Sequence, residues 1–224
     1  MTRAASAPAV QTPETARARQ IRAAAAELFF TRGYEAATLR EIARALELRS
    51  ATLYYYFPDK EAILFEIISS TMEELTEGAE AMLQQETTPE TKLAGFVVNH
   101  IVAHALRPRE TILGDTELRS LTGRRRGTVQ GLRDRYEGLL VDLLEDGGRV
   151  GAFKPLDIKL SAYAVLAQCT NVGIWFRSDG RLGLDAVCHV YANAALRVAG
   201  GPPASQPVIR RLCASARRRY EGVA

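Results

Sequence analysis

The sequence has little of what several classes of protein require. It contains three cysteines, three methionines and one tryptophan among 224 residues, and aromatic residues make up 7%. The cysteines (Cys169, Cys188 and Cys213) are odd in number and widely spaced. This pattern argues against a disulfide framework and favours a reduced, cytoplasmic location.

Long apolar runs and catalytic signatures are also lacking. The longest uncharged stretches, such as residues 160–176, contain Ser, Gln, Asn and Thr and fall short of the roughly 20 apolar residues of a membrane span. The first fifteen residues contain no apolar segment typical of a secretory signal. The sequence has no Gly-x-Ser-x-Gly, P-loop or GxGxxG motif. We therefore expect no membrane partner, no cofactor and no catalytic residue.

The charge is distributed unevenly along the chain. Residues 1–60 hold nine Lys and Arg against six Asp and Glu, so their net charge is 9 − 6 = +3, whereas the remainder holds 20 of each sign. A basic N-terminal segment before a neutral body favours a partner that is a polyanion.

Hydrophobic periodicity predicts an all-α fold of about nine helices. Apolar residues recur at helical spacing, and Gly, Pro and capping residues mark the ends of the segments. The predicted helices cover about residues 13–32, 38–46, 50–56, 60–85, 90–106, 109–121, 127–146, 157–177 and 183–199. An Arg-rich stretch near the C-terminus is either a docked helix or a mobile tail.

The second and third helices are short and joined by a tight turn, as in a helix-turn-helix unit. Thr38 and Glu41 have the spacing of a capping box. Leu53 and Phe57 suit inward anchors, which leaves the hydroxyl groups of the third helix free for bases or phosphates. The alternative is a helical hairpin that only packs, but it does not explain these hydroxyl groups beside a basic first helix.

Residues 21–63 resemble the DNA-binding domain of the TetR family of bacterial transcriptional regulators. The resemblance rests on one ordered run: Ile21, Ala24, Ala25, Leu28, Phe29, Gly33, Tyr34, Ala37, Thr38, Ile42, Ala43, Ala51 to Phe57, Lys60, Glu61 and Ile63. It implies an all-α homodimer that represses transcription from a palindromic operator and leaves the DNA when a small molecule binds.

The resemblance also implies the residues that contact DNA. Thr38, Tyr54, Tyr56 and Lys60 would meet phosphates, while Arg49, Ser50, Ala51, Thr52 and Tyr55 would lie in or beside the major groove. The chain departs from the family at Glu47, where Gly is common. A non-Gly residue at positive φ costs roughly 1 kcal/mol, so the turn geometry is open to change.

The implied organisation has four parts. Residues 1–12 form a flexible tail, 13–59 the DNA-binding domain, 60–200 the ligand-binding and dimerisation domain, and 201–224 a C-terminal extension. The helices at about 157–177 and 183–199 are rich in Ala and would pair with those of a second protomer. An ordinary interface within one chain would show the same small residues.

The C-terminal part contains three short runs of interest: Glu117 to Leu121, Arg133 to Tyr136 and Trp175 to Gly180. In these runs it is similar to a narrower group of TetR-type regulators that sense acyl-CoA thioesters of fatty-acid and sterol catabolism. An apolar tunnel for the acyl chain and arginines for the phosphates would suit such a ligand. Arg124, Arg125 and Arg126 lie together in the sequence. The predicted ligand-binding residues are Phe96, His100, Leu113, Leu118, Arg119, Arg124, Arg125, Arg133, Tyr136, Tyr163, Asn171 and Trp175.

Other interpretations stay open at this point. The arginines are also typical of a solvated face, and the apolar residues of an ordinary core. His100 and His104 are four residues apart, but no third ligand follows them, so we expect no metal. A sensor of drug-like lipophiles that controls efflux, an enzyme acting on CoA esters and an architectural DNA-binding protein remain alternatives.

Overall fold

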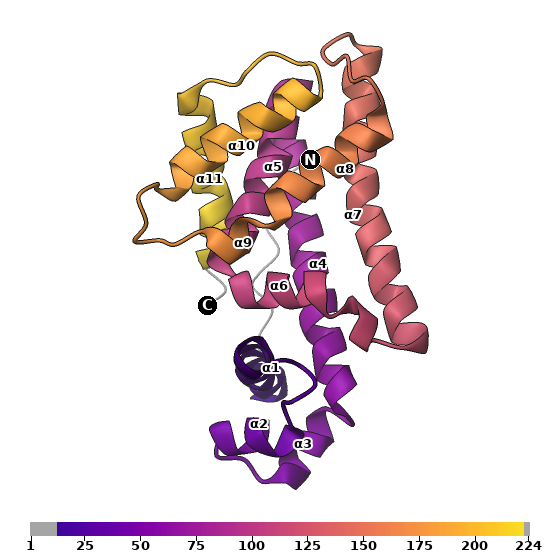
Figure 1. Ribbon diagram of the computed structural model, residues 1–224, viewed down its shortest axis with the longest axis vertical. Helices are drawn as coiled ribbons and strands as arrows, with labels where there is room; N and C mark the ends of the chain where they lie inside the picture. The colour runs from indigo at the N-terminus through magenta and orange to yellow at the C-terminus, as the bar shows by residue number, and fades with distance from the viewer. Residues whose placement is uncertain (1–12, 222–224) are drawn as a thin grey trace, which may run out of the picture. The chain divides into compact units, whose positions relative to one another are not determined.

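The structure is a computed structural model that describes residues 13–221. This part of the chain forms eleven α-helices and one short 3-10 helix, without a strand (Figure 1). The predicted all-α class is therefore confirmed. The tail expected at residues 1–12 lies outside the described residues. None of the helices between residues 13 and 221 is long and apolar enough to span a membrane.

The chain divides into two compact units between Glu66 and Ile67. This division falls inside the long helix α4 (Lys60–Gln85), whereas the expected boundary lay at the start of that helix.

The first unit contains α1 (Pro13–Arg32), α2 (Leu39–Ala45) and α3 (Ser50–Tyr56), followed by the start of α4. Its core is formed by the apolar stripes that the sequence predicts. The fully or nearly buried side chains include Ile21, Phe29, Ile42, Leu53, Phe57 and Ile63.

The second unit is built around α5 (Pro89–Leu106), which is buried along most of its length. Figure 1 shows α10 and α11 on one side of α5 and α7 and α8 on the other, and α5 contacts all four helices. The remaining helices are α6 (Pro108–Thr116), η1 (Leu118–Ser120), α7 (Gly123–Arg149), α8 (Ile158–Thr170), α9 (Val172–Trp175), α10 (Leu184–Val198) and α11 (Gln206–Glu221).

Three predicted helices have different bounds in the structure. The segment at 109–121 is divided into α6 and η1, and the segment at 157–177 is divided into α8 and α9 at Asn171. Helix α7 continues through Gly147 and Gly148, which we expected to end it. Gly147 is needed there for packing, because the Phe153 ring occupies the space of a side chain at this position.

The C-terminal stretch is a docked helix rather than a tail. Helix α11 buries one face against α5 and α10. Arg211 Nη1 and Nη2 also donate to the two carboxylate oxygens of Glu86, at 2.5 and 2.8 Å. At the end of α11, the Tyr220 hydroxyl donates to Asn99 Oδ1 on α5 at 3.0 Å. The helix is thus part of the second unit's core.

Candidate functional site

The start of α2 is held by the predicted capping box. The Thr38 hydroxyl oxygen accepts from the Glu41 N–H at 3.3 Å, and the Glu41 carboxylate accepts from the Thr38 N–H at 3.0 Å. The two hydrogen bonds from Thr38, together with Arg32 nearby, lower the pKa of Glu41 from its ordinary value. The ionised carboxylate therefore holds the entrance to the helix-turn-helix unit in place.

The turn between α2 and α3 passes through Glu47 at φ 54°. Among residues 13–221, Glu47 is the only residue other than glycine that has a positive φ. The Leu48 N–H donates to the Ala43 carbonyl at 2.8 Å and closes the turn. The chain thus keeps the left-handed geometry that Gly favours and places a strained Glu in it.

Helix α3 exposes most of the residues predicted to meet DNA. Leu53 and Phe57 are buried, as expected. Thr52 and Tyr56 are half-buried. Ser50, Ala51, Tyr54 and Tyr55 are exposed, and Arg49 is exposed directly before the helix. This surface offers three kinds of group: a guanidinium, hydroxyl groups and a bare methyl.

Lys60 differs from the other predicted DNA contacts. Its ammonium donates to the carbonyls of Tyr34 at 2.7 Å and Glu35 at 3.1 Å, and it lies 4.2 Å from the centre of the Tyr34 ring. Two of its three protons therefore fasten the segment between α1 and α2. The phosphate contact remains a prediction. Arg40 and Arg44 on α2 are also exposed. They are not among the predicted DNA contacts, although their positive charge could have suggested it.

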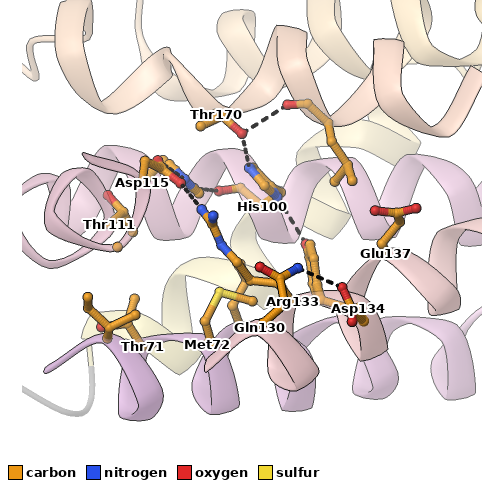
Figure 2. A pocket seen from close by; sticks show the side chains of 16 residues that line it. Thr71, Met72, His100, Thr111, Asp115, Gln130, Arg133, Asp134, Glu137 and Thr170 are labelled. Carbon is orange, nitrogen blue, oxygen red and sulfur yellow. Dashed lines mark hydrogen bonds and ion pairs between the residues drawn. The ribbon is translucent and has the colours of Figure 1, made fainter. Parts of the chain in front are cut away.

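The second unit contains a cavity of about 250 Å³ between α4, α5, α6, α7 and α8 (Figure 2). One part of the wall is apolar and includes Ile68, Met72, Leu75 and Leu166. The rest of the wall carries polar groups. These belong to Thr71, His100, His104, Thr111, Asp115, Gln130, Arg133, Asp134, Tyr136, Glu137 and Thr170.

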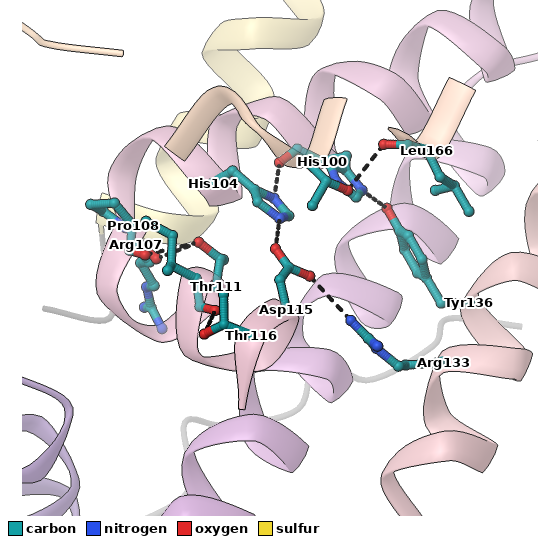
Figure 3. Close-up of polar contacts among 12 residues, drawn as sticks. His100, His104, Arg107, Pro108, Thr111, Asp115, Thr116, Arg133, Tyr136 and Leu166 are labelled. Carbon is teal, nitrogen blue, oxygen red and sulfur yellow. Dashed lines mark hydrogen bonds and ion pairs between the residues drawn. The ribbon is translucent and has the colours of Figure 1, made fainter. Parts of the chain in front are cut away.

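A chain of charged and polar groups joins three helices on one side of the cavity (Figure 3). Arg133 Nη2 on α7 lies 3.2 Å from Asp115 Oδ1 on α6, and Asp115 Oδ2 lies 3.6 Å from His104 Nε2 on α5. His104 Nδ1 donates to the His100 carbonyl at 2.9 Å, because a carbonyl oxygen only accepts. The charge of Asp115 is thus neutralised within the wall.

His100 is the centre of a second set of contacts. Its Nδ1 lies 3.0 Å from the Tyr136 hydroxyl, and its Nε2 lies 3.4 Å from Thr170 Oγ1. Burial holds the pKa of His100 well below its ordinary value, and His104 nearby adds to this effect. Burial also raises the pKa of Tyr136 well above its usual range. Both groups are therefore neutral near pH 7.

The two histidine rings stack at 4.2 Å rather than converge on one point. In the described part of the chain, no group of three or more His, Cys, Asp or Glu side chains has the arrangement of a metal site.

The structure brings only part of the predicted ligand site together. His100, Arg133 and Tyr136 line the cavity. Phe96 stacks on Tyr136 from the core side, at 4.8 Å between ring centres, and Leu113 is buried. The cavity wall does not include Leu118, Arg119, Arg124, Arg125, Tyr163, Asn171 or Trp175. The predicted ligand-binding residues included none from α4. Ile68, Met72 and Leu75 line the cavity, and their i, i+4, i+7 spacing on one helical face could have indicated this.

Helical geometry places Arg126, more than its neighbours, beside the cavity. Arg126 comes four residues before Gln130 and seven before Arg133, both of which line the wall, so all three share one face of α7. Arg124 lies two residues earlier and therefore points roughly 200° away. Arg126 is exposed. Of the three adjacent arginines, Arg126 is thus the one aligned with the cavity.

Helices α8 and α10 carry large apolar side chains on their outer faces. Leu160 and Tyr163 on α8 are 63% and 46% exposed, and Val190 on α10 is 58% exposed. Gln168 Nε2, also on α8, is a buried donor without a hydrogen-bond partner among the described residues. The exposed apolar area on these two helices is typical of a surface that a partner covers.

These features define a helix-turn-helix DNA-binding regulator with a cavity in its C-terminal bundle. Residues 21–67 match the bacterial regulatory proteins of the tetR family, and residues 86–199 match a tetracyclin repressor-like C-terminal domain. The chain belongs to the TetR family. Regulators of this family are DNA-binding proteins without catalytic activity, so the CoA-ester enzyme is set aside.

Three similar proteins illustrate the relationship. The HTH-type transcriptional repressor KstR2 of Mycolicibacterium smegmatis is 28% identical over 185 residues, which cover 81% of this chain and 88% of that protein. The structure of PfmR from Thermus thermophilus is 32% identical with a TM-score of 0.73, over 79% of this chain and 97% of that chain. AibR, solved with isovaleryl coenzyme A and operator DNA, is 27% identical with a TM-score of 0.73, over 80% and 97% of the two chains.

Proposed function

We propose that the protein is a homodimeric repressor that binds a palindromic operator and releases it when a small molecule enters the cavity of the second unit. The observation that carries the proposal is the exposed surface of α3 in a chain that also has a cavity of about 250 Å³. A symmetric dimer would present two α3 helices to successive major grooves, as an operator with two half-sites requires.

The DNA contacts follow from the exposure of each side chain. Arg49, Ser50, Ala51, Thr52 and Tyr55 would approach base edges. Thr38, Tyr54, Tyr56 and the third proton of Lys60 would approach phosphates, which set the register of the protein on the duplex. Arg40 and Arg44 would add phosphate contacts.

The outer faces of α8 and α10 are the proposed dimer interface. Covering Leu160, Tyr163 and Val190 removes apolar area from water, which favours association. The identity of the partner as a second copy is supported by the structural similarity to regulators of this family.

The best-supported effector is a CoA thioester with a short acyl group. The solved AibR complex contains isovaleryl coenzyme A. The cavity is smaller than the roughly 300 to 1,000 Å³ of typical ligand sites, so it suits the acyl end of such a molecule rather than the whole. The phosphates would lie outside, towards Arg126 and the N-terminal end of α7, with Arg119 and Arg125 as further cations.

A cationic lipophile is a second candidate, favoured by the acidic groups of the wall. Asp134 and Glu137 line the cavity, whereas Arg133 is the one Lys or Arg side chain among the lining residues that the structure describes. Because Arg133 is paired with Asp115, the wall offers carboxylates to a cation and few free cations to an anion. This ligand would fit a sensor of drug-like molecules.

Helix α4 provides the proposed link between ligand and DNA. Its first residue, Lys60, fastens the helix-turn-helix unit, and Ile68, Thr71, Met72 and Leu75 further along line the cavity. A ligand that moves this helix would change the spacing of the two α3 helices in the dimer. Release requires that the ligand bind the DNA-free form more tightly, since equal affinity for both forms shifts nothing.

A gel shift against the DNA flanking the protein's own gene tests the function. The salt concentration is held fixed, because phosphate contacts make the affinity steeply salt-dependent. We expect the protein to bind this DNA specifically and one member of an acyl-CoA panel to release it from the DNA. Binding without sequence preference, unchanged by any ligand, would indicate an architectural protein instead.

Two substitutions distinguish the effector classes. Arg126→Ala should weaken CoA-ester binding on the order of tenfold, as expected for one charge-assisted hydrogen bond, while Arg124→Ala on the opposite side of α7 serves as the matched control. Glu137→Gln should weaken a cationic lipophile and spare a CoA ester. The opposite pattern, with Arg126→Ala silent and Glu137→Gln harmful, would replace the CoA ester by the cation.

A further inference from the structure

His100 is a buried polar residue in a wall that is otherwise partly apolar. Its side chain lines the cavity although the residue is only 4% exposed. Figure 2 shows the imidazole between Thr170 and the helix that carries Arg133. A buried polar group is costly unless each of its donors and acceptors is matched, so the protons around His100 can be assigned.

The direction of the Thr170 hydroxyl hydrogen bond is fixed by its backbone partner. The hydroxyl donates to the Leu166 carbonyl at 3.0 Å, and a carbonyl oxygen only accepts. The Thr170 oxygen therefore acts as the acceptor towards His100 Nε2, which must carry the hydrogen.

His100 has a single N–H because it is neutral, with its pKa lowered by burial. Its Nδ1 is then an acceptor, and the Tyr136 hydroxyl donates to it at 3.0 Å. The order of donation runs from Tyr136 through His100 and Thr170 to the Leu166 carbonyl. Figure 2 labels Thr170, and Figure 3 labels Tyr136, His100 and Leu166.

The Nε2–H of His100 makes only a weak hydrogen bond within the protein. The distance from His100 Nε2 to Thr170 Oγ1 is 3.4 Å, whereas N–H···O bonds in proteins cluster near 2.9 to 3.0 Å. The neighbouring wall at Ile68, Met72 and Leu166 offers only aliphatic carbon or sulfur from its side chains. Because its hydrogen bond to Thr170 is long, the Nε2–H of His100 can also donate to an oxygen atom of a ligand.

We propose that His100 is a specificity-determining residue, whose Nε2–H donates to an oxygen atom of the effector's acyl part. This inference rests on the proposed function, because it requires a CoA ester in the cavity. The oxygen has two chemical sources: the thioester carbonyl, or a hydroxyl group further along the acyl chain. In either case the site prefers an oxygen-bearing ligand to the same carbon skeleton without that oxygen.

Three ligands of equal chain length separate the two sources. Butyryl-CoA carries the thioester oxygen, S-butyl-CoA lacks it, and 3-hydroxybutyryl-CoA adds a second oxygen. Their dissociation constants for the wild-type protein are measured by titration calorimetry at one salt concentration. We expect the preferred ligand to bind on the order of tenfold more tightly than its partner without the relevant oxygen, as one well-placed hydrogen bond implies.

Two variants assign this discrimination to His100. His100→Leu should bring the ratio of the two affinities close to one, because it removes the donor and keeps an apolar wall. His100→Gln should keep part of the ratio, since its amide carries an N–H at a similar reach. His189→Leu, the same substitution at a histidine on α10 that does not line the cavity, is the matched control and should keep the discrimination.

Each outcome has a definite meaning. A CoA ester that binds with no preference for oxygen, or a preference that survives in His100→Leu, overturns this inference and leaves the proposed function standing. If none of the three ligands binds the wild-type protein, the CoA-ester proposal fails first. Where His100→Leu does not fold, His100→Gln makes the assignment, and the absence of a preference for oxygen in the wild-type protein alone still overturns the inference.

Discussion

At the scale of single residues, the chain keeps one side chain, that of Glu47, in a backbone geometry that disfavours it. Glu47 adopts φ 54° in the turn before α3, where the family often has Gly. The resemblance points to this position but leaves the turn geometry open, and the structure shows that the positive φ is kept. Because the turn sets the direction of α3, its strain bears on both stability and DNA binding.

Replacing Glu47 by Asn should stabilise the protein. Asn tolerates the left-handed region better than Glu, so we expect a gain on the order of 1 kcal/mol in the free energy of unfolding. Chemical denaturation measures it. Glu47→Ala, which removes the charge but keeps a strained side chain, should show no such gain. Equal stability of the Asn and Ala variants would contradict this explanation.

At the scale of elements, α11 shows how a helix with many arginines becomes part of the core. Its apolar face fits between α5 and α10, and Arg211 ties it to Glu86, whose side chain is 6% exposed. The sequence left a docked helix and a mobile tail open. The choice between the docked helix and the mobile tail depends on the residues of α5 and α10 that α11 packs against, and in the case of α5 these are far away in the sequence.

The pair of Glu86 and Arg211 predicts a dependence of stability on pH. The hydrogen bonds from Arg211 lower the pKa of Glu86 below its ordinary value of 4.5. Its contribution is therefore complete above about pH 4.5 and is lost as the pH falls through the lower, folded-state pKa.

Urea denaturation at a series of pH values checks this dependence. Between pH 5 and pH 3, Glu86→Gln should lose less stability than the wild-type protein, because Gln does not titrate. At pH 7, Arg211→Met should cost about 2 kcal/mol, since it leaves a largely buried carboxylate without its charged donor. An unchanged acid dependence in Glu86→Gln would show that another carboxylate is responsible.

At the scale of the whole molecule, the sequence predicts the elements better than the site. The helix-turn-helix unit could be located because its capping box, turn and anchors are close together in the chain. The cavity could not, because its wall combines residues of five helices. Three of the twelve predicted ligand residues meet there. Gly147 shows the same limit: it appears as a helix breaker until the distant Phe153 ring explains it.

The proposed dimer predicts a coupled loss of assembly and DNA binding. Val190 lies on the outer face of α10 and is 58% exposed, so Val190→Glu should leave the protomer folded and place charge in the interface. Analytical ultracentrifugation should find monomers, and operator affinity should fall. Val150→Glu, at a position 72% exposed and outside α8 and α10, is the control. A dimer that persists in Val190→Glu would move the interface elsewhere.

The central claim is that a ligand inside the cavity releases operator DNA. Gly114 lines the cavity, and a Cβ atom there would meet only Ile68 Cγ2 at 4.0 Å, so the backbone has room for a side chain and Gly114→Leu should occupy part of the cavity. Gly131 on α7, where a Cβ atom meets nothing within 4 Å, provides the same substitution outside the cavity wall.

The most direct measurement is fluorescence anisotropy of labelled operator DNA, titrated with the releasing CoA ester at fixed salt. We expect equal operator affinity for the wild-type protein, Gly114→Leu and Gly131→Leu. The ligand should release the wild-type protein and Gly131→Leu from the DNA, whereas Gly114→Leu should stay bound. Release of Gly114→Leu at the wild-type ligand concentration would contradict the claim.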